Sequence, residues 1–424
     1  MCRSDVLITT ALCLSALIGG NALSQSLKTA RPSESMLVQI QHVETVGDSA
    51  KEPSIVEGPD GTLFVTGFCK LADGQTQQVP RLWKSTDHGA SWTCANIGNV
   101  ADGITGNSDV SLAIAWDGTL YFVQLKYDPK AAEGIHAVVG VSKDLGVSWR
   151  WTTLPKGHFP DRPWIAVAPD GTAHVIWSDA GGVHHTMSRD EGKTWSVPQA
   201  LYGSGGSSHL AVGPHGEVAV RITPSFAGGS KFDAAADFIA VSTDGGHMWQ
   251  NRPPPGYRDW SPEGTEGSIP RWVEPLAWDS NGDLYSLWTN FKGVWLAQSV
   301  DAGTTWTQWR VADIDALSYF PYLTAQGPGE LAATWFSGAG DALQWHLARI
   351  QVGSREAKPQ VVQLSGLKTD SWTAGSQSSS SVRDTAGEYL SVLFLRNGDL
   401  SVVSPIQNPG TNRLGFAFWR FKDR

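Results

Sequence analysis

Charged and phenolic side chains recur near the start of short strand-forming segments along this sequence. Nine such residues are Lys51, Glu52, Asp109, Asp161, Arg162, Arg271, Glu274, Tyr319 and Arg383. Carboxyl groups held near one another have separated pKa values, so one can act as general acid and another as general base in hydrolysis. Guanidinium groups beside them suit an anionic substrate. The pattern predicts a polar ligand site with acid/base chemistry.

An octapeptide pattern, Ser-x-Asp-x-Gly-x-Ser/Thr-Trp, shows what kind of scaffold carries these residues. Its five copies begin at Ser85, Ser142, Ser188, Ser242 and Ser299, and the fourth has Met248 in place of Ser or Thr. The copies recur at intervals of about 50 residues, the period of a four-stranded propeller blade. They therefore predict a repeated β architecture.

The octapeptide has the chemistry of a hairpin turn. Its Asp carboxylate can accept hydrogen bonds from backbone amides of the same turn, and its Gly supplies a positive φ. Its Trp begins the next strand and has a large surface to bury between blades. We therefore interpret the five Asp residues as structural and not catalytic.

A second pattern marks seven units instead of five. Each unit has a short strand, a turn that contains Gly, and a strongly apolar strand; the turn glycines are Gly61, Gly118, Gly171, Gly216, Gly282, Gly329 and Gly387. The last two units lack the octapeptide. Short β-rich segments between such turns are typical of all-β folds.

These repeats predict an all-β propeller of seven four-stranded blades, with six blades as the alternative. The alternating segment Leu37–Val46 is expected to pair with the last blade and close the ring. In simple up-and-down blades, the Asp turns and Asp-Gly turns lie on one face. The nine residues named first would then surround a funnel on the opposite face.

The five octapeptides resemble the Asp boxes, or BNR repeats, of the sialidase superfamily over residues 50–405. The resemblance implies a sialidase-like glycosidase that binds the substrate carboxylate with three Arg residues and uses a Tyr nucleophile, a Glu and an acid/base Asp. By this resemblance Glu274, Tyr319, Tyr322 and Asp73 are candidate catalytic residues. Arg162, Arg271 and Arg383 are the candidate arginines.

The chain departs from the family where the family has Arg-Ile-Pro. This sequence has Lys51-Glu52-Pro53, and a lysine cannot make the planar two-point contact of arginine with a carboxylate. Three hypotheses follow: a sialidase-like hydrolase of acidic glycans, a non-catalytic propeller that binds glycan or protein, and a polysaccharide lyase. No metal-ligand pattern or phosphate-binding loop is found, so neither a metal nor a cofactor is expected.

The N-terminal residues predict export. Arg3 precedes an apolar run from Val6 to Ile18, and Ala22-Leu23-Ser24 suits a cleavage site before Gln25. We expect a signal peptide at 1–24, a flexible segment at 25–36, one propeller domain at 37–424, and a periplasmic or secreted location. No second apolar stretch is long enough to span a membrane.

The net charge bears on the possible binding partners, and the cysteine content bears on disulfide formation. The formal net charge is −9, which makes nucleic acid an unfavourable partner. Cys69 and Cys94 would remain after cleavage, and an even pair in an exported chain suggests a disulfide. A whole strand is expected between them, which argues against the bridge. The sequence leaves the oligomeric state open.

Overall fold

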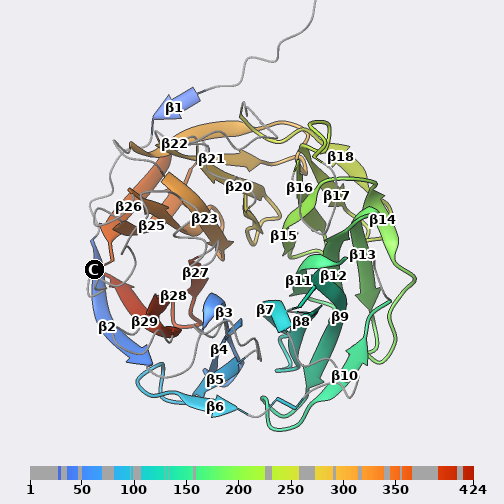
Figure 1. Cartoon of the computed structure of the whole chain (residues 1–424). Helices are drawn as coiled ribbons and strands as arrows, with labels where there is room; N and C mark the ends of the chain where they lie inside the picture. The colour runs from blue at the N-terminus through green and yellow to red at the C-terminus, as the bar shows by residue number, and fades with distance from the viewer. Residues whose placement is uncertain are drawn as a thin grey trace, which may run out of the picture.

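The structure, a computed structural model, describes residues 27–29, 36–45, 50–68, 81–95, 97–98, 107–128, 130–131, 133–155, 159–224, 232–256, 273–289, 293–313, 318–338, 344–353, 356–364, 390–407 and 414–424. Every regular element in these residues is a β-strand. Seven sheets stand in a ring around a central axis, as Figure 1 shows. The prediction of seven blades is confirmed, and the alternative of six is wrong.

The first three blades follow the chain from the innermost to the outermost strand. Blade 1 contains β3 (Lys51–Glu57), β4 (Leu63–Phe68), β5 (Arg81–Ser85) and β6 (Thr93–Ala95). Blade 2 contains β7 (Asn107–Ile114), β8 (Leu120–Asp128), β9 (Glu133–Ser142) and β10 (Arg150–Thr153). Blade 3 contains β11 (Asp161–Val167), β12 (Ala173–Asp179), β13 (Gly182–Ser188) and β14 (Gln199–Tyr202).

The next three blades repeat this antiparallel order, and one of them gains a strand. Blade 4 contains β15 (Gly206–Val212), β16 (Val218–Thr223), β17 (Phe238–Ser242) and β18 (Gln250–Arg252). Blade 5 contains β19 (Leu276–Trp278), β20 (Leu284–Thr289), β21 (Gly293–Ser299) and β22 (Thr307–Asp313), with β1 (Leu27–Thr29) outside them. Blade 6 contains β23 (Ser318–Ala325), β24 (Glu330–Ser337), β25 (Gln344–Val352) and β26 (Ala357–Gln363).

Blade 7 joins the two ends of the propeller. Its inner strands are β27 (Ser391–Phe394), β28 (Leu400–Gln407) and β29 (Leu414–Asp423), and its outermost strand is β2 (Leu37–Thr45) from the beginning of the chain. β2 runs antiparallel to β29, from Leu37 opposite Asp423 to Thr45 opposite Phe416. This confirms the predicted closing strand.

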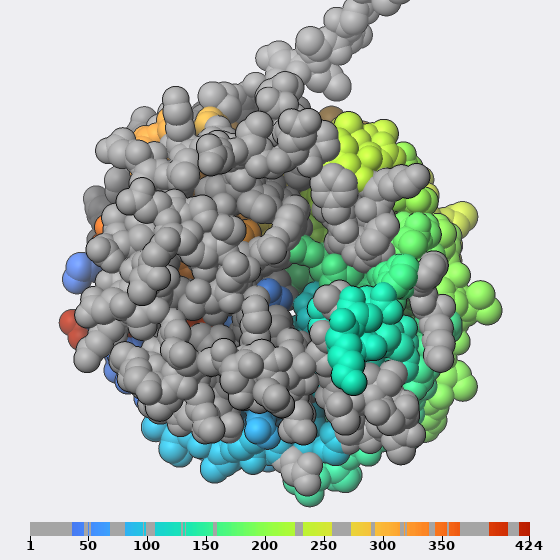
Figure 2. Space-filling model, in the orientation of Figure 1, coloured from blue at the N-terminus to red at the C-terminus, as the bar shows by residue number. Residues whose placement is uncertain are grey.

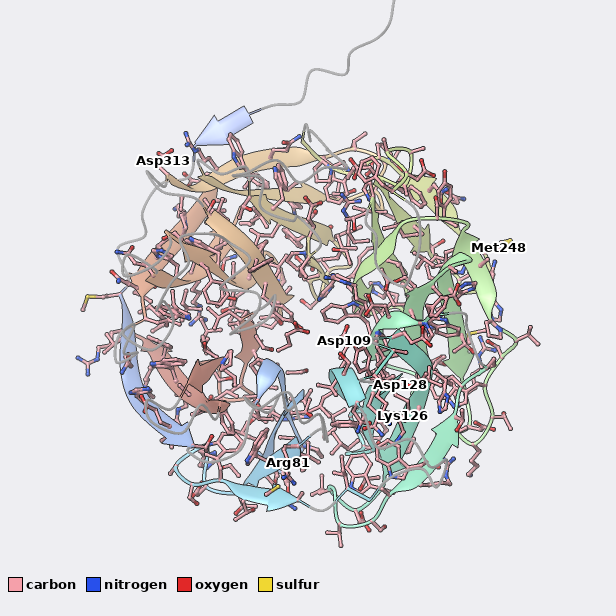
Figure 3. All side chains as sticks on the ribbon, viewed as in Figure 1. Arg81, Asp109, Lys126, Asp128, Met248 and Asp313 are labelled. Carbon is pink, nitrogen blue, oxygen red and sulfur yellow. The ribbon has the colours of Figure 1, made fainter. Side chains whose placement is uncertain are left out.

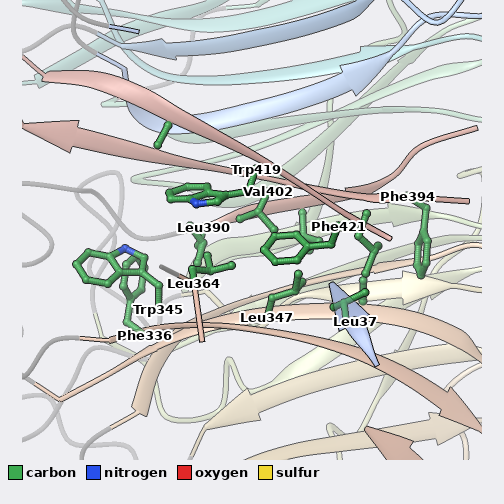
Figure 4. Close-up of a cluster of buried hydrophobic side chains, with 14 of the residues drawn as sticks. Leu37, Phe336, Trp345, Leu347, Leu364, Leu390, Phe394, Val402, Trp419 and Phe421 are labelled. Carbon is green, nitrogen blue, oxygen red and sulfur yellow. The ribbon is translucent and has the colours of Figure 1, made fainter. Parts of the chain in front are cut away.

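Burial of apolar surface reinforces the closure. Leu37 is 5% exposed and belongs to a buried apolar cluster that also contains Trp345 of blade 6 and Trp419 and Phe421 of blade 7. Figure 4 shows this cluster, with Leu37 at the end where Leu347 and Phe421 lie. Similar clusters of buried apolar side chains lie between the other neighbouring blades. The core is therefore divided among the blade interfaces.

The Asp turns have the predicted geometry. In blade 1 the Asp87 carboxylate accepts hydrogen bonds from Ser91 N at 2.9 Å and Ser91 Oγ at 2.6 Å, and Gly89 has a φ of 86°. These bonds to Ser91 lower the pKa of Asp87 to about 2. Four further turns centre on Asp144, Asp190, Asp244 and Asp301, each between the third and fourth strands of its blade.

Each Asp turn also docks its blade onto the preceding one, through its central glycine. A Cβ on Gly89 would lie 2.3 Å from the Phe418 ring of blade 7. On Gly246 of blade 4 it would lie 2.9 Å from His185 of blade 3. The glycines at 146, 192 and 303 face the preceding blade in the same way. Glycine is thus required for close packing as well as for its φ.

The turn of blade 4 is incomplete, and this gives a stability prediction. Ser91, Ser148, Thr194 and Thr305 each donate a hydroxyl hydrogen bond to their Asp at 2.5–2.7 Å, whereas Met248, at the same position, is 73% exposed. We expect Met248→Thr to raise the free energy of unfolding by about 0.5–1 kcal/mol, because it adds the missing bond to Asp244. Urea unfolding measures the change. Met248→Val is the control, and equal effects of Thr and Val would contradict the hydrogen-bond explanation.

A buried histidine pair under the same turn predicts acid sensitivity. His174 Nδ1 lies 3.0 Å from His185 Nε2, and the His185 ring meets the Trp249 ring edge-on at 4.9 Å. Burial lowers the pKa of His174 to about 4 and that of His185 to about 3. Between pH 6.5 and about 4, only the unfolded chain binds these protons. As the pH decreases through this range, the free energy of unfolding should therefore decrease by up to about 1.4 kcal/mol per pH unit for each histidine.

Urea unfolding at pH 7.5, 6 and 5 measures this slope. Replacing His185 by Gln should reduce it, because only one buried histidine then remains in the pair. The control is His215→Gln, since the His215 side chain is 66% exposed and bonded to Glu217. Equal slopes in the two variants would show that the pair is not the source. The carboxyl groups of Asp87, Asp144 and Asp190 have pKa values of about 2, so their titration lies below the pH range of this experiment.

Candidate functional site

The two faces of the propeller differ in what they carry. Turns between strands one and two and between strands three and four, including the Asp turns, lie on one face, here called the turn face. Links between strands two and three, and between blades, lie on the opposite face, the loop face. Figure 2 shows the β8–β9 hairpin at the surface of the loop face, beside the centre of the ring.

The innermost strands are bulged where they approach the loop face. The pairing register shifts between Lys51 and Ser54, between Asp161 and Trp164, and between Tyr319 and Tyr322. Within these bulges Glu52, Arg162 and Phe320 have φ values of 51°, 50° and 51°. A left-handed conformation costs a non-glycine residue on the order of 1 kcal/mol, and bulges commonly adjust side chains at functional sites.

Most predicted site residues lie at these bulged ends. Lys51 and Glu52 are on β3, Asp109 on β7, Asp161 and Arg162 on β11, and Tyr319 on β23. Glu52 is buried, with 7% exposure, whereas Asp109, Asp161 and Arg162 are half-buried. Asp73, Arg271 and Arg383, together with Cys69 of the expected disulfide, lie outside the described residues. Cys94 is on β6 and exposed.

Tyr127 lies near the loop-face end of β8, within electrostatic reach of three aspartates on adjoining strands. Burial raises the pKa of Tyr127, and the charges of Asp161, Asp109 and Asp128 raise it further. These aspartates come from three strands, β11, β7 and β8. In Figure 3, Asp109 and Asp128 lie on blade 2, and Asp109 is the nearer to the centre of the ring. Tyr127 therefore stays protonated and can donate a hydrogen bond beside the carboxylates.

A buried polar row lies across blade 2 next to this group. Lys126 is paired in register with Asn107 on one side and His136 on the other, and none of the three is more than 3% exposed. Gln124 is also buried, at the strand position where blade 3 has Trp177. Buried polar and charged groups need compensating interactions and are concentrated at functional sites.

Sequence reasoning missed this row and Tyr127. A signal was present at Gln124, because the equivalent residue of the second strand is Trp177, Ile222, Trp288 and Trp335 in blades 3–6. Gln124 and Lys126 also alternate with apolar residues in β8. The alternation alone resembles that of a strand with one solvated side. Its functional meaning depends on both faces of β8 being covered by neighbouring blades.

Glu274 is held by a buried arginine from the neighbouring blade. Arg221, on β16, is fully buried and donates to Glu274 Oε2 from Nε at 2.9 Å and from Nη2 at 2.6 Å. Nη2 also bonds Asp237. The charges of Glu274 and Asp237 outweigh burial and raise the pKa of Arg221. The Glu274 carboxylate is thus committed to an ion pair between blades 4 and 5.

Tyr322 lies deeper than the bulges and reaches across the ring axis. Its ring meets His209 of blade 4 at 5.6 Å, and His209 contacts Trp164 of blade 3 at 5.0 Å. Blades 4 and 6 are not neighbours, so this contact crosses the ring. Burial raises the pKa of Tyr322 to about 12, against the opposing effect of a hydrogen bond with Ser391. These aromatic side chains lie below the carboxylates of the loop face.

The described part of the chain has neither a cluster of metal-ligating side chains nor a membrane-spanning helix. No three His, Cys, Asp or Glu side chains in the described part of the chain are arranged to hold a metal ion. No helix that is long and apolar enough to cross a membrane occurs in that part either.

Comparison with known proteins supports the fold. No family model and no curated protein matches the chain. A solved protein of unknown function from Dyadobacter fermentans aligns with a TM-score of 0.54 and 14% identity, covering 92% of this chain and 99% of the other. An α-L-arabinofuranosidase from Fusarium graminearum, bound to an iminosugar inhibitor, aligns with a TM-score of 0.51 and 13% identity, covering 90% of this chain and 97% of the other. YCF48 from Cyanidioschyzon merolae aligns with a TM-score of 0.51 and 12% identity, covering 90% of this chain and 98% of the other.

The buried ion pair gives a prediction about blade packing. Arg221→Met should lower the free energy of unfolding by about 3–5 kcal/mol, because it leaves the Glu274 carboxylate buried without its cation. The double variant Arg221→Met/Glu274→Gln should recover part of this loss. Chemical unfolding of both single variants and the double variant gives the coupling energy. Additive losses would contradict a direct interaction.

Proposed function

We propose that this chain is a glycoside hydrolase that binds a glycan on the loop face, at the inner ends of blades 1–3. The observation that carries the proposal is that Asp109, Asp128 and Asp161 lie on the adjoining strands β7, β8 and β11, close enough to Tyr127 for their charges to raise its pKa. Two carboxyl groups at one site can divide the chemistry of glycoside hydrolysis between them. One can protonate the glycosidic oxygen while another acts as base or nucleophile.

Asp109 and Asp161 are the proposed acid/base pair, and Tyr127 is a hydrogen-bond donor beside them. Both aspartates lie on innermost strands and are half-buried, so they remain reachable from the loop face. Glu52, buried at the bulge of β3, and Lys51 beside it in sequence extend the proposed substrate site towards blade 1. The fold shared with an α-L-arabinofuranosidase is consistent with glycan hydrolysis.

The finer form of the proposal is an acidic, sialic-acid-type substrate, with the protein exported to the periplasm or secreted. It rests on the resemblance of the five octapeptides to Asp boxes. Here Arg162, Arg271 and Arg383 would bind the substrate carboxylate, and Tyr319 or Tyr322, Glu274 and Asp73 would carry the sialidase-type chemistry. Arg162, half-buried on the bulge of β11, is the described arginine best placed for this role.

A non-catalytic propeller that binds glycan or protein is the second candidate. The environments of two candidate catalytic residues, Glu274 and Tyr322, favour this second candidate. The Glu274 carboxylate is 1% exposed and bonded to Arg221, and burial raises the pKa of Tyr322 to about 12. A nucleophile must reach the substrate and lose its proton readily, which neither environment favours.

The test uses the mature protein, residues 25–424, on a panel of fluorogenic sialosides, neutral glycosides and uronic-acid polysaccharides. We expect hydrolysis of one glycoside class, with kcat reduced by about 10²–10⁴-fold in Asp109→Asn and in Asp161→Asn, because each removes a proton-transfer group. Asp313→Asn is the matched control, since its side chain is 74% exposed on the outer wall of blade 5.

Each result selects one hypothesis. Free sialic acid, lost in Glu274→Gln, Tyr319→Phe or Tyr322→Phe, supports the sialidase-type form, provided that circular dichroism shows a folded variant. An unsaturated, ultraviolet-absorbing product identifies a lyase. Saturable glycan binding without turnover of any substrate overturns the hydrolase and leaves the binding propeller.

A further inference from the structure

The outer edges of the blades differ in length. In blades 1–4 the outermost strands β6, β10, β14 and β18 have only three or four residues. In blades 5, 6 and 7 the fourth strands β22, β26 and β2 have seven, seven and nine. A long strand edge offers unpaired backbone groups to another strand, whereas a short one does not. Only the last three blades therefore need protection at this edge.

Two of the long edges carry their own protection. β26 contains Lys358 and Pro359, and proline has no backbone N–H to donate. β2 has a register shift between Gln39 and Gln41, which interrupts a regular edge. Both features discourage strand addition.

The third long edge is covered by the chain itself. β22 is in regular register with β21 from Thr307 to Arg310, and this stretch contains no proline. β1 pairs with it in parallel, with Leu27 opposite Gln308 and Thr29 opposite Arg310. Figure 1 shows β1 on the outer wall beside β22. Among the seven described sheets, only this one has a fifth strand.

We propose that the outer edge of β22 is a strand-acceptor site, and that the residues Leu27–Thr29 of a second copy can occupy it. A second copy offers the same residues to the same edge, in the same register and with the same backbone pairing. Exchange then requires no new contact, and domain swapping of this kind is a low-cost route to dimers. The product is a dimer in which each copy covers blade 5 of the other.

The exchange involves β1 without opening the propeller. β1 is held by three residue pairs, whereas β2, which follows it in the chain, is held by eight pairs with β29. The shorter strand is released more easily. β2 stays in blade 7 and keeps the ring closed. Blade 5 is also three blades away from Asp109, so the proposed substrate site is not part of this interface.

Concentration should control the exchange. The segment of the same chain competes with that of the second copy, because it is covalently joined to β2 of its own ring. Such tethering corresponds to an effective concentration of roughly millimolar. Dimer formation is therefore expected to rise steeply as the protein approaches about 1 mM.

Disulfide trapping tests the register and the exchange together, in mature protein with Cys69→Ser and Cys94→Ser. One chain carries Thr29→Cys only and the other Arg310→Cys only, so the two cysteines can meet only between copies. We expect a disulfide-linked dimer whose yield rises with concentration. Adding Lys28→Pro to the first chain should reduce the yield at least tenfold, because proline disrupts the added strand.

The matched control replaces Arg310→Cys by Asp313→Cys, which is on β22 but is not opposite any residue of β1. Its dimer yield should be at least tenfold lower. Sedimentation of the unsubstituted mature chain should show a concentration-dependent dimer that is absent from a chain beginning at Met36. Equal trapping at residues 310 and 313, or a monomer at every concentration, overturns the proposal.

Discussion

The docking of each Asp-turn glycine against the preceding blade is the contact on which the arrangement of the first five blades depends. The aspartate fixes the turn by accepting several hydrogen bonds, and the turn then presents a glycine, with no side chain, to a ring or side chain of its neighbour. Local hydrogen bonding within one blade is thereby converted into close packing between two. Because the five contacts point the same way around the ring, each blade helps to orient the next.

Buried polar groups occur in every blade, and several have specific partners. Between blades 4 and 5, Arg221 compensates Glu274, and between blades 3 and 4 the neutral pair His174 and His185 hydrogen-bonds internally. Blade 2 contributes the buried row of Asn107, Lys126 and His136, on the strands β7–β9. This row lies next to the strands that carry Asp109, Asp128 and Asp161, and this is the physical reason for proposing the site at blades 1–3.

The sequence predicted the parts of the fold that depend on neighbours in the chain. The Asp turns, the seven-unit repeat and the closing strand Leu37–Thr45 follow from local turn chemistry and alternation. The pairs between blades do not, since Arg221 and Glu274 are 53 residues apart and no local pattern connects them. The bulges at Glu52 and Arg162 were also missed, because a left-handed residue that is not glycine has no sequence signature. Tyr127 was missed because its environment comes from three separate strands.

The pairing of Leu37 with Asp423 also bears on how the chain acquires its shape during synthesis. Blades 1–6 consist of consecutive hairpins, which can form as soon as each stretch leaves the ribosome. β2 emerges before all of them, yet its partner β29 follows all of them in the chain. The ring must therefore stay open, with β2 unpaired, until β29 has been synthesised. Loop-closure entropy grows only slowly with length, so this late step delays closure more than it weakens the finished ring.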